Sequence, residues 1–310
     1  MNYIQQAYKG VNEFWMFLIT SVVVSGIFVI NFIIYLLVSK EDMEALYESA
    51  KSIPANTSLV INLVPFAFLL GLLFLLVKFM HQRSLLSLTT SRLKVDWSRI
   101  LFSFILIVIL TITSFTVAYY MDPSAVEFQF NASKFAVLFI ISIILFPFQI
   151  GLEEYLFRGY FIQQIGILVK NRWFPLLFTS VLFGIAHSAN PEVAEMGLIV
   201  MIFYIGTGLL LGIMTLMDEG LELALGFHLG NNLLAALLVT SDWSALQTDA
   251  VFKYTAEEAN TTALEILIPV LVFYPLILFI LSKKYGWTNW KDKLFGKIVE
   301  PPKENYKVLD

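Results

Sequence analysis

The sequence predicts an all-α, polytopic membrane protein that folds as one helical bundle, and two observations lead to this prediction. Hydrophobic residues make up 58% of the 310 residues and charged residues only 14%, whereas soluble domains have roughly 45–50% and about 25%. The apolar residues also gather into long runs, and a run of about 20 residues crosses a bilayer as a helix. We therefore expect a single membrane domain over residues 1–310.

About eight apolar runs predict transmembrane helices. Short polar breaks separate them, as in one bundle. The fourth run is long and carries charged residues, and the fifth is short, which indicates either an obliquely packed pair or a re-entrant break near those charges. The runs cover approximately Phe14–Val38, Leu59–Phe79, Ile100–Tyr120, Phe135–Gly166, Trp173–His187, Met196–Met217, Leu221–Val239 and Leu264–Leu281.

The positions of lysine and arginine predict the orientation. If the N-terminus is cytosolic, the loops on the cytosolic side carry most of the basic residues, and the opposite side has only Lys40, Lys51, Lys134 and Lys253. The positive-inside rule then places both termini in the cytosol. The basic side has Lys9, Lys78, Arg83, Arg92, Lys94, Arg99, Lys170, Arg172 and the lysines from Lys283 onward.

Composition argues against several functions. Because the chain has no cysteine, cysteine proteases and cysteine-ligated zinc are excluded. The net charge is only -4 and the basic residues form no dense patch, so no nucleic-acid partner is expected. The lipid bilayer is the first expected partner.

The stretch "GLEEYLFRGY", residues 151–160, places three ionisable residues inside the fourth apolar run. Glu154 and Arg158 are four apart, so they share a helical face with the acid before the base. Their pairing offsets the cost of an arginine at membrane depth, about 2.5–3.5 kcal/mol. Glu153 lies about 100° round the helix from Glu154 and lacks such a partner. A carboxylate in that position is suited to act as a general base.

Two of the three histidines also lie inside apolar runs. His81 lies in a basic loop, where we expect a solvated surface residue, but His187 and His228 are intramembrane. A single buried histidine is more often a structural hydrogen-bonder, whereas two of them with a spare glutamate favour a functional site. Glu153 and His187 lie 17 residues to either side of Lys170, so an antiparallel hairpin brings them to the same depth.

The seventh apolar run adds a carboxamide to these groups. His228 and Asn232 are four residues apart, so they share a helical face and are expected to face one cavity. Asn231 is expected to point elsewhere. We expect the resulting polar site to open towards the cytosolic half of the membrane.

Three motifs in separate apolar runs resemble those of the CPBP family of intramembrane proteases. This family includes the CAAX prenyl-protein endopeptidases and bacterial relatives tied to bacteriocin processing or immunity. The resemblance covers residues 135–239, the expected catalytic core. The motifs are E-E-x-x-x-R at Glu153, Glu154 and Arg158, F-x-x-x-H at Phe183 and His187, and H-x-x-x-N at His228 and Asn232.

The resemblance implies a glutamate endopeptidase that needs no metal or other cofactor. Glu153 and His187 would activate a water, and His228 and Asn232 would stabilise the oxyanion. Support would come from Glu154, Arg158 and Phe183. The substrate would be a membrane-associated peptide or protein, with or without a lipid modification. The expected location is a multi-pass position in a bacterial inner membrane.

Other functions stay open from the residues alone. Zinc held by the two histidines and a glutamate is a lower-ranked version of the same protease, since no H-E-x-x-H is present. A non-proteolytic immunity or regulatory partner would keep the polar residues only for helix association. A proton-relaying transporter ranks third, because no hydropathy repeat is visible. The acidic segment 241–262 is interpreted as a solvated linker rather than a gate.

Overall fold

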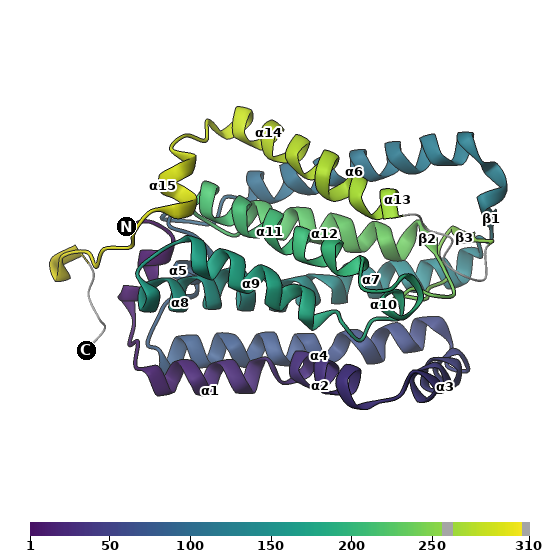
Figure 1. Ribbon diagram of the computed structural model, residues 1–310, viewed down its shortest axis with the longest axis horizontal. Helices are drawn as coiled ribbons and strands as arrows, with labels where there is room; N and C mark the ends of the chain where they lie inside the picture. The colour runs from purple at the N-terminus through teal and green to yellow at the C-terminus, as the bar shows by residue number, and fades with distance from the viewer. Residues whose placement is uncertain (256–262, 306–310) are drawn as a thin grey trace.

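Helices account for most of the computed structural model, which describes residues 1–255 and 263–305. Figure 1 shows them running roughly side by side along the longest axis of the molecule. Within the described residues, five helices are long and apolar enough to cross a membrane. They are Ala55–Met80, Trp97–Met121, Ala132–Val169, Val200–Asp218 and Glu265–Tyr285.

The N-terminal apolar run forms a bent pair of helices. Helices α1 (Phe14–Val24) and α2 (Gly26–Leu37) meet at an angle of 62°, and together they form a sixth candidate span. The chain is therefore an all-α, polytopic, integral membrane protein, as the sequence predicts.

Two of the eight expected spans are shorter than a membrane crossing. Helices α9 (Trp173–Ala186) and α12 (Glu222–Leu237) have 14 and 16 residues. At about 1.5 Å per residue they extend about 21 and 24 Å, less than the hydrocarbon core of about 30 Å. Helix α9 packs on α11 (Val200–Asp218), and α12 packs on α6 (Trp97–Met121) and α7 (Ala132–Glu153). Hydropathy predicted both helices but overestimated their length.

The fourth run is one continuous helical segment and contains no re-entrant loop. Helix α7 passes directly into a π-helical stretch, Glu154–Phe161, and then into α8 (Ile162–Val169). π-Helical turns inside α-helices occur frequently at functional sites. The wide turn begins immediately after Glu153, where the charged motif lies.

A small sheet and the helices not yet described complete the fold. Strands β1 (Val126–Phe128), β2 (Val239–Thr240) and β3 (Phe252–Tyr254) form a sheet in the order β1–β3–β2, antiparallel between β1 and β3 and parallel between β2 and β3. The remaining elements are the 3₁₀ helices Ile4–Lys9, Pro123–Ala125 and Lys303–Asn305, the π-helical stretches Leu76–Met80 and Pro269–Phe273, and α3 (Lys40–Lys51), α4 (Ala55–Leu75), α5 (Leu85–Thr89), α10 (Pro191–Met196), α13 (Ala263–Ile268), α14 (Tyr274–Tyr285) and α15 (Trp290–Phe295).

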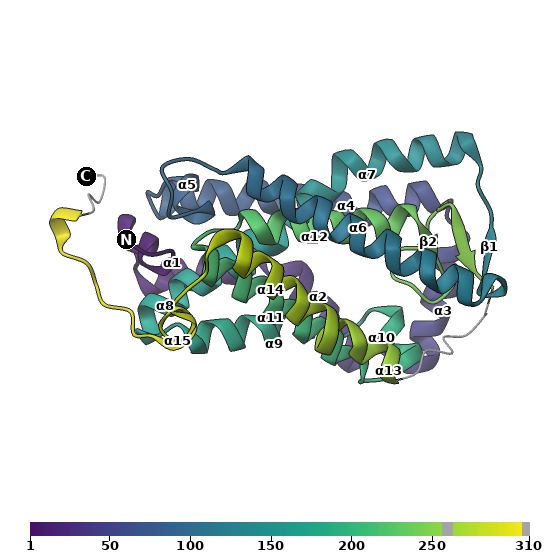
Figure 2. The same cartoon turned by 90° about the horizontal axis from the view of Figure 1, so that it is seen from above.

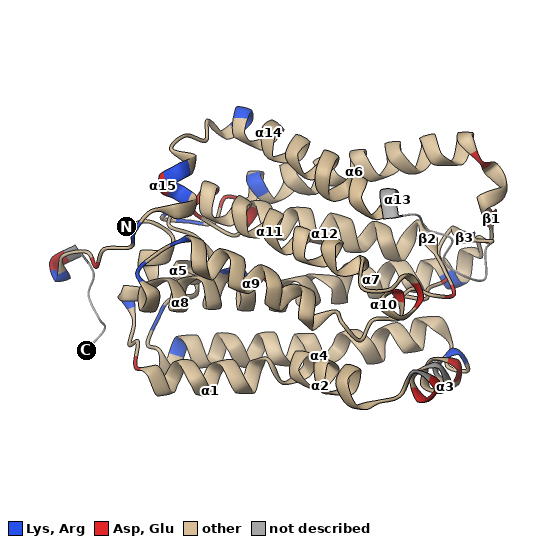
Figure 3. Cartoon of the chain, viewed as in Figure 1, with Lys and Arg blue, Asp and Glu red and all other residues tan. Residues whose placement is uncertain are grey.

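The two ends of the bundle differ in their elements and in their charge. Figures 1 and 2 place α3, α10 and the three strands at one end, and the N-terminus, α5, α8 and α15 at the other. The Gln5 side chain donates to the Val299 carbonyl at 2.7 Å, which joins the first and last described segments at that second end. Lys and Arg gather mainly at the end with the N-terminus (Figure 3). We call this the basic end.

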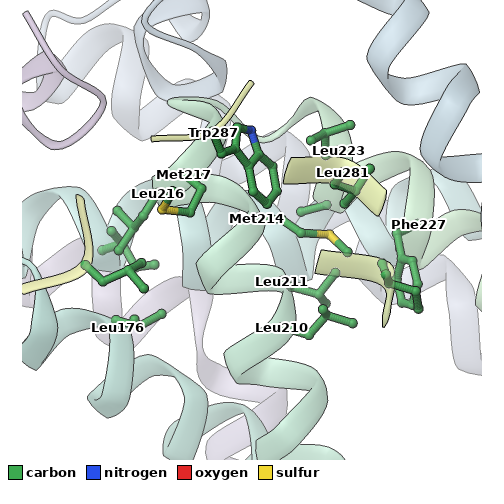
Figure 4. Close-up of a cluster of buried hydrophobic side chains, with 14 of the residues drawn as sticks. Leu176, Leu210, Leu211, Met214, Leu216, Met217, Leu223, Phe227, Leu281 and Trp287 are labelled. Carbon is green, nitrogen blue, oxygen red and sulfur yellow. The ribbon is translucent and has the colours of Figure 1, made fainter. Parts of the chain in front are cut away.

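The largest hydrophobic cluster joins the C-terminal helices. Met214 on α11, Phe227 on α12, Leu281 on α14 and Trp287 are all buried in it (Figure 4). Burial of one such side chain contributes about 1.5–3 kcal/mol. This cluster fixes α11 and α12, which carry site residues, against the outer helix α14.

Glycines let the short helices approach their neighbours closely. A Cβ added at Gly226 of α12 would lie 2.0 Å from the Ile100 carbonyl oxygen of α6, and one at Gly208 of α11 would lie 2.9 Å from the Ser180 backbone of α9. Small residues permit such contacts between membrane helices. Both glycines therefore serve helix packing.

The expectation that His81 is a solvated surface residue is wrong. Its side chain is 1% exposed. Its Nε2 lies 3.2 Å from the Thr20 hydroxyl and 3.0 Å from that of Tyr160, and its Nδ1 lies 3.0 Å from the Val11 carbonyl oxygen. His81 thus contacts α1 and the residue Val11 before it, a tertiary contact that the local basic sequence does not reveal.

Candidate active site

Adjacent glutamates occupy the junction between α7 and the π-helical stretch. Glu153 is the last residue of α7 and Glu154 the first of the π-helical stretch, and both side chains are buried. An isolated buried carboxylate is costly, so each requires polar neighbours. Glu154 is bonded to an arginine and a histidine, whereas Glu153 is bonded to a glutamine.

Glu154 is held by two cationic or hydrogen-donating side chains. Arg158 Nη1 donates to its Oε1 at 2.8 Å, and His228 Nδ1 donates to the same oxygen at 2.8 Å. Glu154 and Arg158 are both fully buried. The guanidinium also lies 4.2 Å from the Phe183 ring centroid, a cation–π contact. The pairing expected from the four-residue spacing is present, and His228 extends it to α12.

Glu153 has less compensation. Gln149 Nε2, one turn earlier on α7, donates to its Oε1 at 2.5 Å. Its Oε2 is buried and accepts no hydrogen bond from any described residue. His228 Nε2 lies 3.6 Å from that oxygen, close enough for an ion pair when protonated but beyond a normal hydrogen bond. This oxygen therefore keeps an unused acceptor capacity, although it is itself buried.

His187 follows the last residue of α9 and presents one ring nitrogen to the site. Its Nδ1 donates to the Phe183 carbonyl at 2.7 Å, which fixes the proton on that nitrogen in the neutral ring. The ring stacks on Tyr204 of α11 with centroids 4.4 Å apart and contacts Phe183 at 4.6 Å. Packing thus fixes the ring plane, and Nε2 is left as a proton acceptor.

Asn232 is linked to Glu153 through Gln149. Asn232 Nδ2 donates to Gln149 Oε1 at 2.9 Å, and the other end of the same carboxamide donates to Glu153. Asn231, expected to point elsewhere, donates to Asn232 Oδ1 at 3.2 Å. Gln149 therefore orients the acid and the amide together, in a chain of hydrogen bonds that spans α7 and α12.

A cavity of about 740 Å³ connects these groups to the protein surface. Gln149, Glu153, His187 and Asn232 line it together, so the structure places Glu153 and His187 at one cavity. His228 is absent from the described lining, because its ring lies against the two glutamates. The expectation that His228 and Asn232 face one cavity therefore holds only for Asn232.

The cavity extends away from the basic end. Its outer wall is formed by Tyr47 and Lys51 of α3, Glu192 of α10, residues 239–241 and 244–247, and Tyr254 of β3. These elements lie together at the end opposite the N-terminus (Figure 1). The acidic segment is thus more than a plain linker, because its residues 241, 244–247 and 254 line the cavity. Residues 256–262 of the segment lie outside the described residues. The sequence predicted an opening towards the cytosolic half, where most lysines and arginines are expected. The cavity instead extends towards the end opposite the basic end.

Two residues of the site were missed by sequence reasoning. Gln149 carried a visible signal, since it is a polar residue one turn before Glu153 in an apolar run. Tyr204 carried none, because its contact with His187 depends on how α11 packs against α9.

Comparisons with known proteins identify the family. Residues 132–234 match the family model described as type II CAAX prenyl endopeptidase Rce1-like. The chain is also 31% identical over 248 residues to the uncharacterized protein YyaK of Bacillus subtilis (strain 168), covering 77% of this chain and 83% of that protein. No solved structure matches.

All the motif residues, from Glu153 to Asn232, lie within the matched region. The relative extends the similarity well beyond it, over most of both chains. The chain therefore belongs to the CPBP family of CAAX-type intramembrane proteases.

Proposed function

We propose that the protein is an intramembrane endopeptidase that hydrolyses a peptide bond of a membrane-associated protein or peptide through a water activated by Glu153. The observation that carries this proposal is the buried Oε2 of Glu153, which has no hydrogen-bond partner among the described residues and belongs to a residue lining a cavity. A general base needs such a free oxygen within reach of the proton that it removes.

Glu153 and His187 would handle the protons. Glu153 Oε2 removes a proton from the water, whose oxygen forms a bond to the scissile carbonyl carbon while the carbonyl electron pair moves to oxygen. The tetrahedral intermediate then expels the amine, and the C–N bond breaks as a proton is delivered to nitrogen. His187 Nε2 is suited to hold the water and then to pass the proton, because its other nitrogen is fixed by Phe183.

Asn232 is the best-supported oxyanion donor. Its side chain lines the cavity, and one amide hydrogen is used to hold Gln149 in place. The second amide hydrogen is available to a developing oxyanion, an interaction that typically contributes about 2.7–4 kcal/mol to catalysis. Support for His228 in the same role is weaker. With Nδ1 on Glu154 and Nε2 beside Glu153, we assign it to positioning of the base.

Zinc is the main chemical alternative. Both histidines have Nδ1 bonded to an oxygen acceptor and Nε2 free, an arrangement that zinc ligands also use. Across residues 1–255 and 263–305, however, no group of three or more His, Asp or Glu side chains is arranged so that it could hold a metal ion. His228 does meet both glutamates, but its Nδ1 is already bonded to Glu154. The donor geometry therefore favours the metal-independent mechanism, and we propose no cofactor.

The decisive experiment compares wild type with Glu153→Gln in native membrane vesicles. Mass spectrometry should find peptides with defined new termini that only the wild type releases. Glu127→Gln, at an exposed glutamate on β1, is the matched control and should cleave like wild type. Equal peptide profiles for wild type and folded Glu153→Gln would overturn the proposal and favour a non-proteolytic immunity or regulatory partner.

A further inference from the structure

The cavity leads from the site to one end of the molecule, and polar and apolar side chains line it together. From Glu153 and His187 it passes Asn62 of α4 and Asn190 and reaches Glu192 and residues 239–241 and 244–247. Polar groups line this route beside apolar ones such as Leu63 and Phe66, so an extended polypeptide finds hydrogen-bonding partners along it.

The outer end of the cavity is on the side of the membrane that the charge distribution assigns to the exterior. The opposite end carries most of the described lysines and arginines (Figure 3). Short loops rich in lysine and arginine remain in the cytosol. With the basic end inside, α3, α10 and residues 239–247 lie outside.

Glu192 is an uncompensated acid on this outer wall. Its Oε1 accepts a hydrogen bond from the Ala245 backbone at 2.8 Å, while its Oε2 is buried with no hydrogen-bond partner among the described residues. Burial raises the pKa of its carboxyl above the usual value, although the Ala245 hydrogen bond opposes this shift. A positive charge brought beside it would restore the ionised form and replace the lost hydration.

Two lysines at this end of the molecule are already engaged by other acids. Lys51 pairs with Glu48 at 2.5 Å, and Lys253 pairs with Asp242 at 2.9 Å. Neither lysine forms an ion pair with Glu192 in the described part of the chain. The missing cation is therefore one that a ligand can supply.

We propose that the peptide enters the cavity from the non-cytosolic side and that Glu192 binds a cationic group on it, either a free amino terminus or a lysine or arginine side chain. This inference rests on the proposed function, because it concerns the substrate of that site. It makes Glu192 a specificity-determining residue. It also makes the substrate a peptide whose polar part is exposed outside the cytosol.

The absence of native cysteine allows a test that needs no proteolysis. Ala235→Cys places a thiol on the cavity wall, three residues after Asn232 on α12, and Ser244→Cys places one near Glu192. Membrane-impermeant methanethiosulfonates, one cationic and one anionic, are applied to spheroplasts and to inverted vesicles. Lys291→Cys at the basic end is the orientation control.

Both cavity cysteines should react in spheroplasts, and Lys291→Cys only in inverted vesicles. Glu192→Gln should lower the ratio of cationic to anionic labelling rates by about fourfold, for unit charges roughly 10 Å apart in water. Glu192→Asp, which keeps the charge, should keep the ratio. Labelling of Ala235→Cys from the cytosolic face alone, or a ratio unchanged by Glu192→Gln, would overturn the proposal.

Short synthetic peptides identify the source of the cation. Each carries one positive group, either a free amino terminus or a lysine behind an acetylated terminus, and a neutral peptide is the control. If one charged peptide slows labelling of Ser244→Cys more than the neutral peptide does, its positive group is the one that Glu192 binds. If neither charged peptide slows labelling more than the neutral one, the result counts against the proposal. If labelling behaves as expected while Glu153→Gln has no effect on cleavage, the entry route stands and the protease assignment fails.

Discussion

Glu154→Gln should strongly destabilise the folded protein. The substitution removes the only charge that contacts Arg158 within 4 Å in the described structure, at 2.8 Å, while both side chains are 0% exposed. Breaking a buried pair by removal of one partner costs about 3–5 kcal/mol, because the remaining charge is left uncompensated. Glutamine has nearly the same shape and keeps an oxygen that can accept a hydrogen bond from His228. The loss of unfolding free energy therefore reports the removal of the charge.

The assay is unfolding in mixed detergent micelles by titration with dodecyl sulfate, followed by circular dichroism. The double variant Glu154→Gln with Arg158→Met removes both charges, and we expect a coupling free energy of about 2–3 kcal/mol relative to the two single variants. The exposed pair of Glu48 and Lys51 is the control, and Glu48→Gln should cost at most about 1 kcal/mol. A loss below 1 kcal/mol for Glu154→Gln, or additive single variants, would refute the reasoning.

Three further predictions test the remaining parts of the site and fold. Gln149→Leu should reduce peptide release by about 10²-fold with little loss of folded protein, because misorientation of Glu153 and Asn232 is a positional defect; unchanged release in the vesicle assay would contradict the bridging role. Zinc chelators such as 1,10-phenanthroline should leave release unchanged, and loss that added zinc restores would reverse the choice of mechanism. Burial lowers the pKa of His81, so the unfolded chain binds the proton more tightly than the folded protein, and stability should fall as the pH drops below about 6.5. Thermal unfolding at several pH values should show this dependence in wild type and a weaker one in His81→Gln.

Local spacing in the sequence was sufficient for the features that lie within one helix or one hairpin. The four-residue interval between Glu154 and Arg158 predicted their pair, and the equal distances from Lys170 predicted the shared depth of Glu153 and His187. Both inferences use only helical geometry, which the apolar context enforces. Both inferences therefore agree with the structure, although nothing in the sequence indicated the π-helical stretch Glu154–Phe161.

Features that depend on distant segments could not be predicted in this way. Burial of His81 needs contacts with Val11 and Tyr160, and the cavity wall at residues 239–241 and 244–247 needs β3 to pair with β1, more than 120 residues earlier in the chain. Local composition describes both segments as polar loops. Their positions follow from how the helices pack, which hydropathy does not encode.

The contrast between Glu153 and Glu154 explains how one dipeptide can supply both a structural and a chemical carboxylate. Neighbours on a helix point about 100° apart, so Glu154 meets Arg158 and His228 while Glu153 meets Gln149 and the cavity. The partners of Glu154 also matter to Glu153, since without them a second buried carboxylate would lie beside it with no compensation. Different environments for two adjacent carboxyl groups are the pattern by which acid and base roles are separated in enzymes. Under the proposed function, Arg158, although absent from the cavity lining, would set the electrostatic conditions in which Glu153 acts.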